Sequence, residues 1–179
     1  MKVLIIVDMQ NDFVTGALGT PEAQAIVGNI KWKLECARQN GDLVIFTRDT
    51  HHTNYLETKE GQKLPVPHCI KDTDGWQIIP ELTPVEGEII INKPTFGSLN
   101  IADAISNFLM KRTKITSLDS IDICGVCTDI CVVSNALILK ANYFNICDIY
   151  VDHQCCAGVT PESHEAALTT MKMCQINVI

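Results

Sequence analysis

The chain has 179 residues, which is enough for one well-buried domain and short for two. Its 21 acidic residues outnumber 14 lysines and arginines, giving a net charge of −7 at pH 7. This balance argues against nucleic acid or an anionic membrane as a partner, because phosphate binding needs clustered lysines and arginines. The densest basic cluster, Lys111, Arg112 and Lys114, is typical of an exposed helix end. We therefore expect a single domain over residues 1–179.

The N-terminal segment MKVLIIVDMQ does not have the pattern of a signal peptide. Its apolar run covers only residues 3–7, ends at Asp8 and is not followed by a small-residue cleavage site. No apolar stretch approaches the ~20 residues that are needed to span a bilayer. Nine cysteines without a secretion signal indicate a reducing, cytoplasmic setting in which the thiols are buried or catalytic.

Short runs rich in isoleucine and valine alternate along the chain with helical patterns. Because these runs are continuous rather than alternating with polar residues, they are typical of parallel strands covered on both faces. Strands are predicted over residues 3–8, 43–47, 89–92, 121–126, 146–152 and 175–179, and helices over residues 21–40, 99–112, 129–142 and 161–173. With right-handed crossovers, this order predicts a doubly wound α/β sheet of about six mostly parallel strands with helices on both faces.

Local signals mark the ends of these helices. Thr20-Pro21 and Thr160-Pro161 each offer an N-cap hydroxyl followed by proline at the first helical position. Asn40-Gly41 supplies the left-handed residue that ends the first helix. Residues 49–88 do not fit the alternation, and a long irregular segment rich in His, Asp and aromatic residues is typical of a functional loop.

Polar side chains follow the predicted strands at their carboxyl ends, where ligands bind in sheets of this kind. Asp8 ends the first strand, Asp49 follows the second, Lys93 follows the third and Cys127 follows the fourth. A carboxylate, an amine and thiols are therefore expected to meet at one edge of the sheet although they lie far apart in sequence.

Cys131 is the strongest candidate for a nucleophile. It falls in the first turn of the helix predicted over residues 129–142, where free N–H groups and the helix dipole favour an anion and would lower the thiol pKa. Asp8 could take the thiol proton and later deliver it to a leaving amine, while Lys93 holds Asp8 ionised. The backbone N–H groups of Cys127 and Cys131 would face the developing oxyanion.

Not every cysteine needs a catalytic role. Cys124 lies inside a predicted strand, where a small buried thiol is the common case, and the adjacent Cys155 and Cys156 are best explained by packing. Cys124, Cys127 and Cys131 could instead bind a metal or an iron–sulfur cluster. That would require a fourth ligand and a loop, whereas strand and helix geometry separates them.

Three motifs in the chain resemble the signatures of the isochorismatase-like cysteine hydrolases. They are DMQNDF at 8–13, NKPTFGS at 92–98 and GVCTDICVVSNA at 125–136. The sequence is most similar to the nicotinamidase (pyrazinamidase) branch, and the resemblance spans nearly the whole chain, including DHQCCAGVTPESHEAAL at 152–168.

Carried over by motif position, this resemblance implies a catalytic triad of Asp8, Lys93 and Cys131. It also implies a cis peptide bond between Val126 and Cys127, which would turn both amide groups toward the oxyanion.

The segment TRDTHHTN…PVPHCIKDTDGW resembles the metal-binding loop of nicotinamidases. Matched by position, the implied ligands are Asp49, His51 and His68, whereas His52 has no counterpart. Two imidazoles and one carboxylate suit a catalytic divalent metal, above all Zn²⁺, with Mn²⁺ or Fe²⁺ as alternatives. Such an ion could bind a substrate's ring nitrogen or activate the water that releases an acyl-enzyme.

The substrate pocket matches the branch only in part. Phe13 occupies a position that, by resemblance, packs on the substrate ring. Nicotinamidases usually carry a tryptophan three positions before the histidine matched by His68, and this chain has Pro65 there. Trp76 or Tyr55 could supply the missing ring.

The resemblance implies a cysteine-dependent amidohydrolase that converts nicotinamide or a similar small carboxamide to the acid and ammonia through a thioester acyl-enzyme. A second hypothesis keeps the fold and triad but places a ureido, carbamoyl or other small amide in the site. A third, from another class, is a non-catalytic thiol- or metal-binding module. The resemblance and the ample apolar surface also suggest a homo-oligomer.

Overall fold

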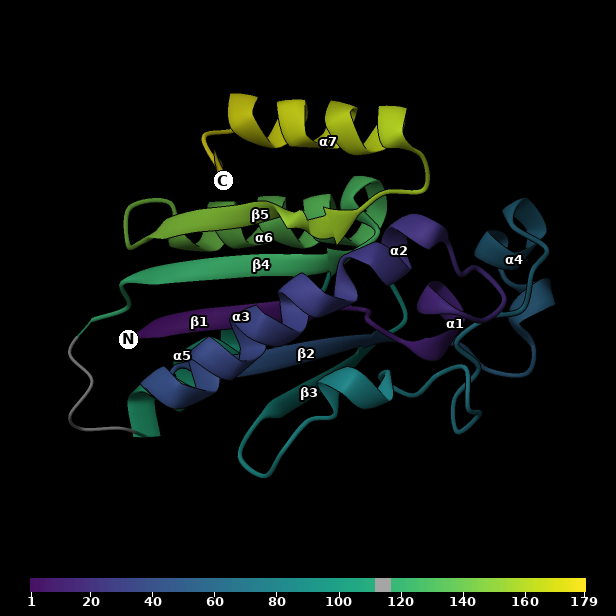
Figure 1. Ribbon diagram of the computed structural model, residues 1–179, viewed down its shortest axis with the longest axis horizontal. Coiled ribbons are helices and arrows are strands. Elements are labelled where there is room, and N and C mark those ends of the chain that lie inside the picture. Colours follow the sequence, from purple (N-terminus) through teal and green to yellow (C-terminus); the bar gives the residue numbers. More distant parts are fainter. Residues whose placement is uncertain (112–116) are drawn as a thin grey trace.

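The structure, a computed structural model, describes residues 1–111 and 117–179 (Figure 1). Its strands are β1 (Lys2–Val7), β2 (Leu43–Asp49), β3 (Ile89–Lys93), β4 (Ser120–Val126), β5 (Asp148–Ala157) and β6 (Asn177–Val178). They form one sheet in the order β3-β2-β1-β4-β5-β6, in which every neighbouring pair is parallel. The predicted doubly wound α/β fold is confirmed, and its sheet is parallel throughout the described residues.

The central strands are buried on both faces. In β1, Ile5, Ile6 and Val7 have no exposed surface, and β4 is similarly buried at Ile121. Strands of this kind need apolar side chains at consecutive positions, which is why the isoleucine- and valine-rich runs locate them in the sequence. The outer strand β3 has water on one side, and its Ile90 is 41% exposed.

β5 differs most from its prediction, because it runs to Ala157 rather than ending at residue 152. A register shift against β4 between Ile123 and Gly125 lets pairing resume at Cys156 and Ala157. Such a bulge inserts extra residues into one strand without ending the ladder. The apolar pattern breaks at the bulge, and for this reason the predicted end of the strand is too early.

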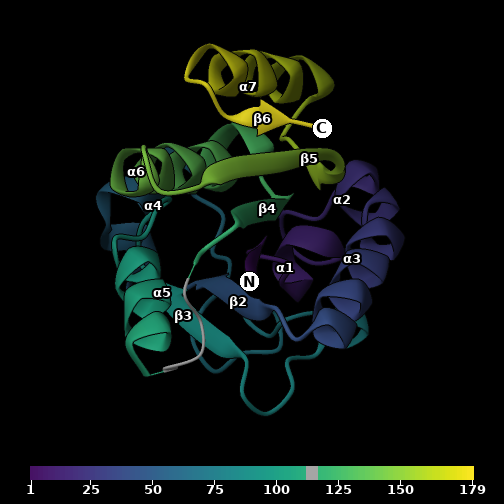
Figure 2. The same ribbon diagram turned by 90° about the vertical axis from the view of Figure 1, so that its left-hand side faces the viewer.

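Helices cover both faces of the sheet. They are α2 (Pro21–Ala25), α3 (Val27–Asn40), α5 (Asn100–Lys111), α6 (Val133–Tyr143) and α7 (Pro161–Met173). Seen along the sheet, α3 lies on one face and α5 and α6 lie on the other, while α7 lies beyond β5 and β6 (Figure 2). The predicted helix 161–173 is confirmed, with the Thr160 hydroxyl accepting the N–H of Ser163 as its cap.

The helix predicted over 21–40 is two helices separated by Ile26. The Thr20 side chain caps α2 by accepting the N–H of Ala23. Gly41 ends α3 at φ 70°, a left-handed conformation that costs glycine little.

The other two predicted helices begin one residue away from their predicted starts. The helix predicted over 129–142 begins with a π-helical turn, Thr128–Val132, which continues into α6. The helix predicted over 99–112 is described to Lys111 as α5, and Arg112 and Lys114 of the basic cluster lie outside the described residues. No helix in the described parts of the chain is long and apolar enough to cross a bilayer.

The irregular segment 49–88 contains three short helical turns that the sequence did not predict: Tyr55–Glu57, α4 (Lys59–Lys63) and Pro80–Leu82. Together with α1 (Asn11–Val14), α4 lies beyond the carboxyl ends of the strands (Figure 1). The segment therefore covers the edge of the sheet at which the polar residues were expected.

Gly125 allows β4 to approach β1 closely, and this contact yields a stability prediction. Its φ is +118°, and an added Cβ would lie 2.1 Å from the backbone oxygen of Val7. Gly125→Ala should therefore lower the free energy of unfolding by roughly 3 kcal/mol, measured by urea denaturation. Gly28→Ala, at a helical position with open space around it, is the control and should raise it by roughly 0.5–1 kcal/mol. Equal stability of the two variants would contradict this account.

Candidate active site and metal centre

The strand order reverses between β1 and β4, and the carboxyl ends of these strands form the crevice in which sheets of this type bind ligands. Asp8 directly follows β1, Lys93 ends β3, and Cys131 lies in the π-helical turn after β4. The structure thus brings together three predicted residues that the sequence separates by 38 positions or more.

The three side chains form a buried cluster. Nζ of Lys93 lies 2.6 Å from Oδ2 of Asp8 and 3.5 Å from Sγ of Cys131. The Thr47 hydroxyl donates to Oδ1 of Asp8 at 2.6 Å. Asp8 and Lys93 are at most 1% exposed, and Cys131 is 5% exposed. Oδ2 of Asp8 is buried, and its close polar neighbour is the Lys93 ammonium.

The backbone at Asp8 is held in an uncommon conformation. Its φ is +52°, in the left-handed region that costs a non-glycine residue roughly 1 kcal/mol or more. Its N–H lies 3.2 Å from both the backbone oxygen and the hydroxyl oxygen of Thr47, so the end of β2 fixes this turn. The conformation aims the carboxylate at the ammonium instead of continuing the strand.

The electrostatics favour a protonated lysine between the carboxyl of Asp8 and the sulfur of Cys131. Burial raises the pKa of the Asp8 carboxyl, and the Lys93 ammonium opposes that shift. Burial alone would lower the pKa of Lys93, but the neighbouring carboxylates, above all Asp8, outweigh burial and raise the pKa. The ammonium therefore stays protonated across the physiological range.

The prediction that the helix start lowers the pKa of Cys131 is not met. Burial, followed by the neighbouring Asp8 carboxylate, raises the pKa of this thiol well above its ordinary value, and Lys93 offsets only part of the shift. Full burial shifts a pKa by up to about 3–5 units, whereas a helix terminus contributes about 0.3–1 kcal/mol, less than one unit. Burial dominates, so the resting sulfur is a thiol.

The turn that carries Cys131 is fixed from several sides. The peptide bond between Val126 and Cys127 is cis. The Thr128 hydroxyl lies 2.8 Å from Nδ1 of His164 on α7, and the Asp129 carboxylate accepts the N–H of Val159. These contacts join the start of the turn to the C-terminal helix.

Asn135 links the loop that follows β3, the strand ending at Lys93, to the π-helical turn that carries Cys131. Its side-chain amide donates to the backbone oxygen of Cys131 at 2.8 Å, and its side-chain oxygen accepts the N–H of Ser98 at 2.9 Å. Asn135 is fully buried. It therefore couples the two segments that supply the ammonium and the sulfur.

A second cluster of polar side chains lies beside the first. Asp49, His51, Glu60 and His68 each offer a ligand atom, and these atoms lie within 4.8 Å of one another. Nε2 of His51 and of His68 lie 3.0 Å and 3.5 Å from Oδ2 of Asp49. Burial would raise the pKa of Asp49, but its contacts with both histidines outweigh burial and lower it. The cluster therefore presents an ionised carboxylate to a cation.

The donor set fits a divalent metal such as Zn²⁺. Two imidazole nitrogens and carboxylate oxygens are its usual catalytic ligands. The Nδ1 atom of His68 lies 2.8 Å from the backbone oxygen of Val66, which leaves Nε2 facing the cluster. The side-chain amide of Gln10 donates to the backbone oxygen of Asp49 and accepts its backbone N–H, which fixes the backbone of this ligand. Glu60 was not among the predicted ligands, because it lies on the unpredicted helix α4. The cluster formed by described residues contains no cysteine, so it does not include the thiols that were considered as alternative metal ligands.

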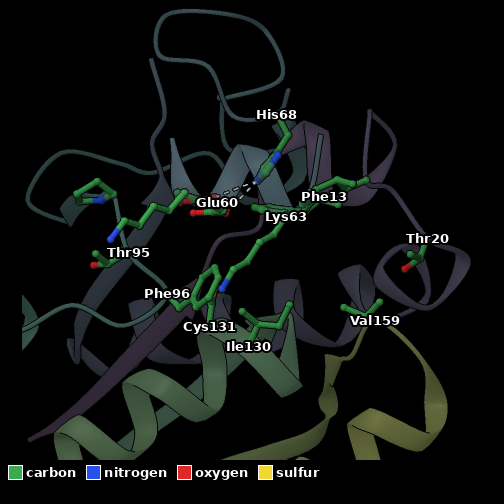
Figure 3. A pocket seen from close by; sticks show the side chains of 15 residues that line it. Phe13, Thr20, Glu60, Lys63, His68, Thr95, Phe96, Ile130, Cys131 and Val159 are labelled. Atoms are coloured by element: carbon green, nitrogen blue, oxygen red, sulfur yellow. Dashed lines mark ion pairs between the residues drawn. The ribbon is translucent and has the colours of Figure 1, made fainter. Parts of the chain in front are cut away.

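A cavity of about 620 Å³ opens over both clusters (Figure 3). Cys131 and Ile130 lie at its base (Figure 3), and Phe13 is among its lining residues. Trp76 and Tyr55 do not line this cavity: the Trp76 indole donates to Thr50, and Tyr55 packs edge-on against His68. The second aromatic ring of the cavity is instead Phe96.

Over residues 2–179 the sequence matches the isochorismatase domain family. The chain belongs to this family. It is 27% identical over 199 residues to a nicotinamidase of Escherichia coli, with 96% of this chain and 90% of that protein covered. It is 23% identical over 157 residues to a ureidoacrylate amidohydrolase of Cronobacter sakazakii, with 74% of this chain and 66% of that protein covered.

A pyrazinamidase of Pyrococcus horikoshii, solved in complex with zinc, has a similar structure. It is 28% identical, the match covers 99% of this chain and 98% of that chain, and the TM-score is 0.83. The relatives of this isochorismatase-family protein thus include amidohydrolases, which are hydrolases of C–N bonds other than peptide bonds.

The buried ion pair of this family member gives a prediction about stability. Lys93→Met leaves the Asp8 carboxylate buried and unpaired, so the free energy of unfolding should fall by about 3–5 kcal/mol. Adding Asp8→Asn to this variant removes the unpaired charge and should restore about 2 kcal/mol of the free energy of unfolding. Asparagine is chosen because it tolerates the left-handed backbone conformation. Urea denaturation of both single variants and the double variant measures the coupling. Losses that simply add would show that the two groups do not interact.

Proposed function

We propose that the protein is a cysteine-dependent amidohydrolase that releases ammonia from nicotinamide or a similar small carboxamide. The observation that carries this proposal is the contact of the Lys93 ammonium with both the Asp8 carboxylate and the Cys131 sulfur at the base of the cavity. A nucleophile, a base and an orienting cation are the minimum set for acyl transfer through a covalent intermediate.

In this proposal the Cys131 thiol passes its proton to Asp8 as the sulfur attacks the amide carbon. The carbonyl oxygen takes the developing negative charge and accepts hydrogen bonds from the backbone N–H groups of Cys127 and Cys131. Asp8 then gives its proton to the leaving nitrogen, the C–N bond breaks, and ammonia departs from a thioester. Water next attacks the thioester, its proton returns through Asp8 to the sulfur, and the carboxylic acid is released.

We also propose that Asp49, His51, Glu60 and His68 hold a divalent metal, with Zn²⁺ as the first choice and Mn²⁺ or Fe²⁺ as alternatives. When bound, such an ion supplies Lewis acidity that can polarise a substrate group or lower the pKa of a bound water. Asp49 and His68 themselves line the cavity, so these ligands face the space in which the substrate would lie.

A ureido or carbamoyl compound is the second candidate substrate. The similarity to a ureidoacrylate amidohydrolase favours it, and so does Pro65, which replaces an aromatic residue expected on the cavity wall. The same proton transfers between Cys131 and Asp8 would serve a ureido carbon, because its leaving group is also a nitrogen.

The proposed setting is the cytoplasm. All nine cysteines are free thiols, as expected in a reducing compartment. A homo-oligomer is proposed as well, since large apolar side chains such as Met110, Phe144 and Ile146 are at least 60% exposed.

The nucleophile is tested by Cys131→Ala. Ammonia release from a panel of carboxamides and ureido compounds should fall roughly 10³-fold or more, because this variant lacks the sulfur that forms the thioester. Mass spectrometry of the quenched wild-type reaction should find the acyl group on the peptide that contains Cys131. Cys174→Ala removes an exposed thiol and is the control, which should retain activity. Undiminished ammonia release by Cys131→Ala would overturn the proposal.

The metal site is tested through binding rather than turnover. Glu60→Gln and His68→Ala should each lower zinc affinity at least roughly 10-fold, because each removes one donor from the cluster. Titration against a competing chelator, with elemental analysis after dialysis, measures this. His52→Ala changes an exposed neighbour and should bind zinc like the wild type. Normal zinc affinity in Glu60→Gln would remove Glu60 from the ligand set, and none in the wild type would refute the site.

A further inference from the structure

One wall of the cavity carries two lysines that the proposed reaction does not use. Lys59 and Lys63 are the first and last residues of α4, and both line the cavity. Neither forms an ion pair within the described residues. The acidic residues of the same cavity, Asp49 and Glu60, face the imidazoles of the metal cluster instead. Two ammonium groups are thus left without a counter-charge.

The helix itself does not account for both lysines. A cation at the C-terminal residue of a helix, such as Lys63, is favourable, but one at the N-terminal residue, such as Lys59, opposes the dipole. The chain as a whole is acidic, with a net charge of −7, so two unpaired cations that line the same cavity depart from the overall composition. Their placement is better explained by a ligand than by local stability.

In the cavity, the proposed nucleophile and the two lysines are carried by different segments of the chain. Cys131 lies at the base, and the apolar side chains of Phe13 and Phe96 line the space above it. In Figure 3 the Lys63 side chain extends across the opening, with its ammonium end directed toward Phe96 and the base of the cavity. The cavity volume of about 620 Å³ lies within the range of roughly 300–1,000 Å³ that holds drug-sized ligands, so there is room beyond a single pyridine ring.

We propose that the preferred substrate is a small carboxamide with an anionic group, a carboxylate or a phosphate, which Lys59 and Lys63 bind while the amide carbon lies at Cys131. The two lysines are then specificity-determining residues. This inference rests on the proposed amidase activity and narrows its substrate class. Ammonium groups pair with either anion as point charges, without the fixed fork geometry of arginine, so they tolerate anions placed at different distances from the amide.

The test compares matched amides that differ in charge. Monoamides of dicarboxylic acids of increasing length are anionic, and the corresponding diamides are neutral. The charge preference is the kcat/KM of the monoamide divided by that of the diamide, after the diamide value is halved because the diamide carries two reactive amides. The wild type should favour the best monoamide by roughly 5-fold to 10-fold. Lys59→Gln/Lys63→Gln should abolish this preference, and about 0.5 M sodium chloride should weaken it. A phosphate monoester of a hydroxyalkanamide tests whether the anionic group of the substrate is a phosphate rather than a carboxylate.

Two controls accompany the double variant. Lys31→Gln removes an exposed lysine of α3, outside the cavity, and should keep the wild-type ratio. Lys59→Arg/Lys63→Arg retains both charges and should keep a preference for the anionic amides. Each of the replaced lysines is exposed, so folding is not at stake.

The outcomes separate the two proposals. A charge preference that disappears only when Lys59 and Lys63 lose their charges supports the inference, and a higher rate with the phosphate identifies that anion. Cys131-dependent hydrolysis with the same ratio in the wild type and the glutamine variant overturns the inference but leaves the amidase intact. Failure of the wild type to hydrolyse any amide refutes the proposed function and the inference with it.

Discussion

The site depends on one buried ion pair, between Asp8 at the end of β1 and Lys93 at the end of β3. Since β2 lies between these strands, the pair must bridge two strand spacings of about 4.8 Å each, which requires a side chain as long as lysine. Neither charge has water to stabilise it, so each stabilises the other. The shared ammonium also contacts the sulfur of Cys131, so the ion pair and the nucleophile form one cluster.

Much of this arrangement was predictable because the sheet is parallel. A parallel sheet covered on both faces needs continuous apolar strands, which are easy to locate, and it gathers their carboxyl ends at one edge. The positions of Asp8, Asp49 and Lys93 therefore followed from where each apolar run stops. The end of β5 did not follow, because the bulge opposite Gly125 breaks the apolar pattern while pairing continues.

Residues whose role depends on the irregular segment could not be predicted from periodicity. Glu60 and Lys63 lie on a helix of only five residues that is fixed by its N-cap Thr58 and by tertiary contacts rather than by an apolar stripe. Asn135 occurs within a recognisable motif, yet its link between two loops is visible only once both are placed. The pKa of Cys131 was predicted in the wrong direction, because the helix position is local information and burial is not.

Because the pKa of Cys131 is raised, the thiol must lose its proton during the proposed reaction rather than before it. A permanently anionic sulfur would be reactive toward oxidants, whereas a buried neutral thiol is inert until its proton is removed. Asp8 is suited to that removal because burial raises the pKa of its carboxyl, which makes the carboxylate a stronger base, while the Lys93 ammonium opposes that shift. Since Lys93 contacts both partners, moving the proton shifts negative charge from one neighbour of the ammonium to the other without leaving it unpaired. The ion pair that joins the ends of β1 and β3 thus keeps the proposed proton transfer electrostatically balanced.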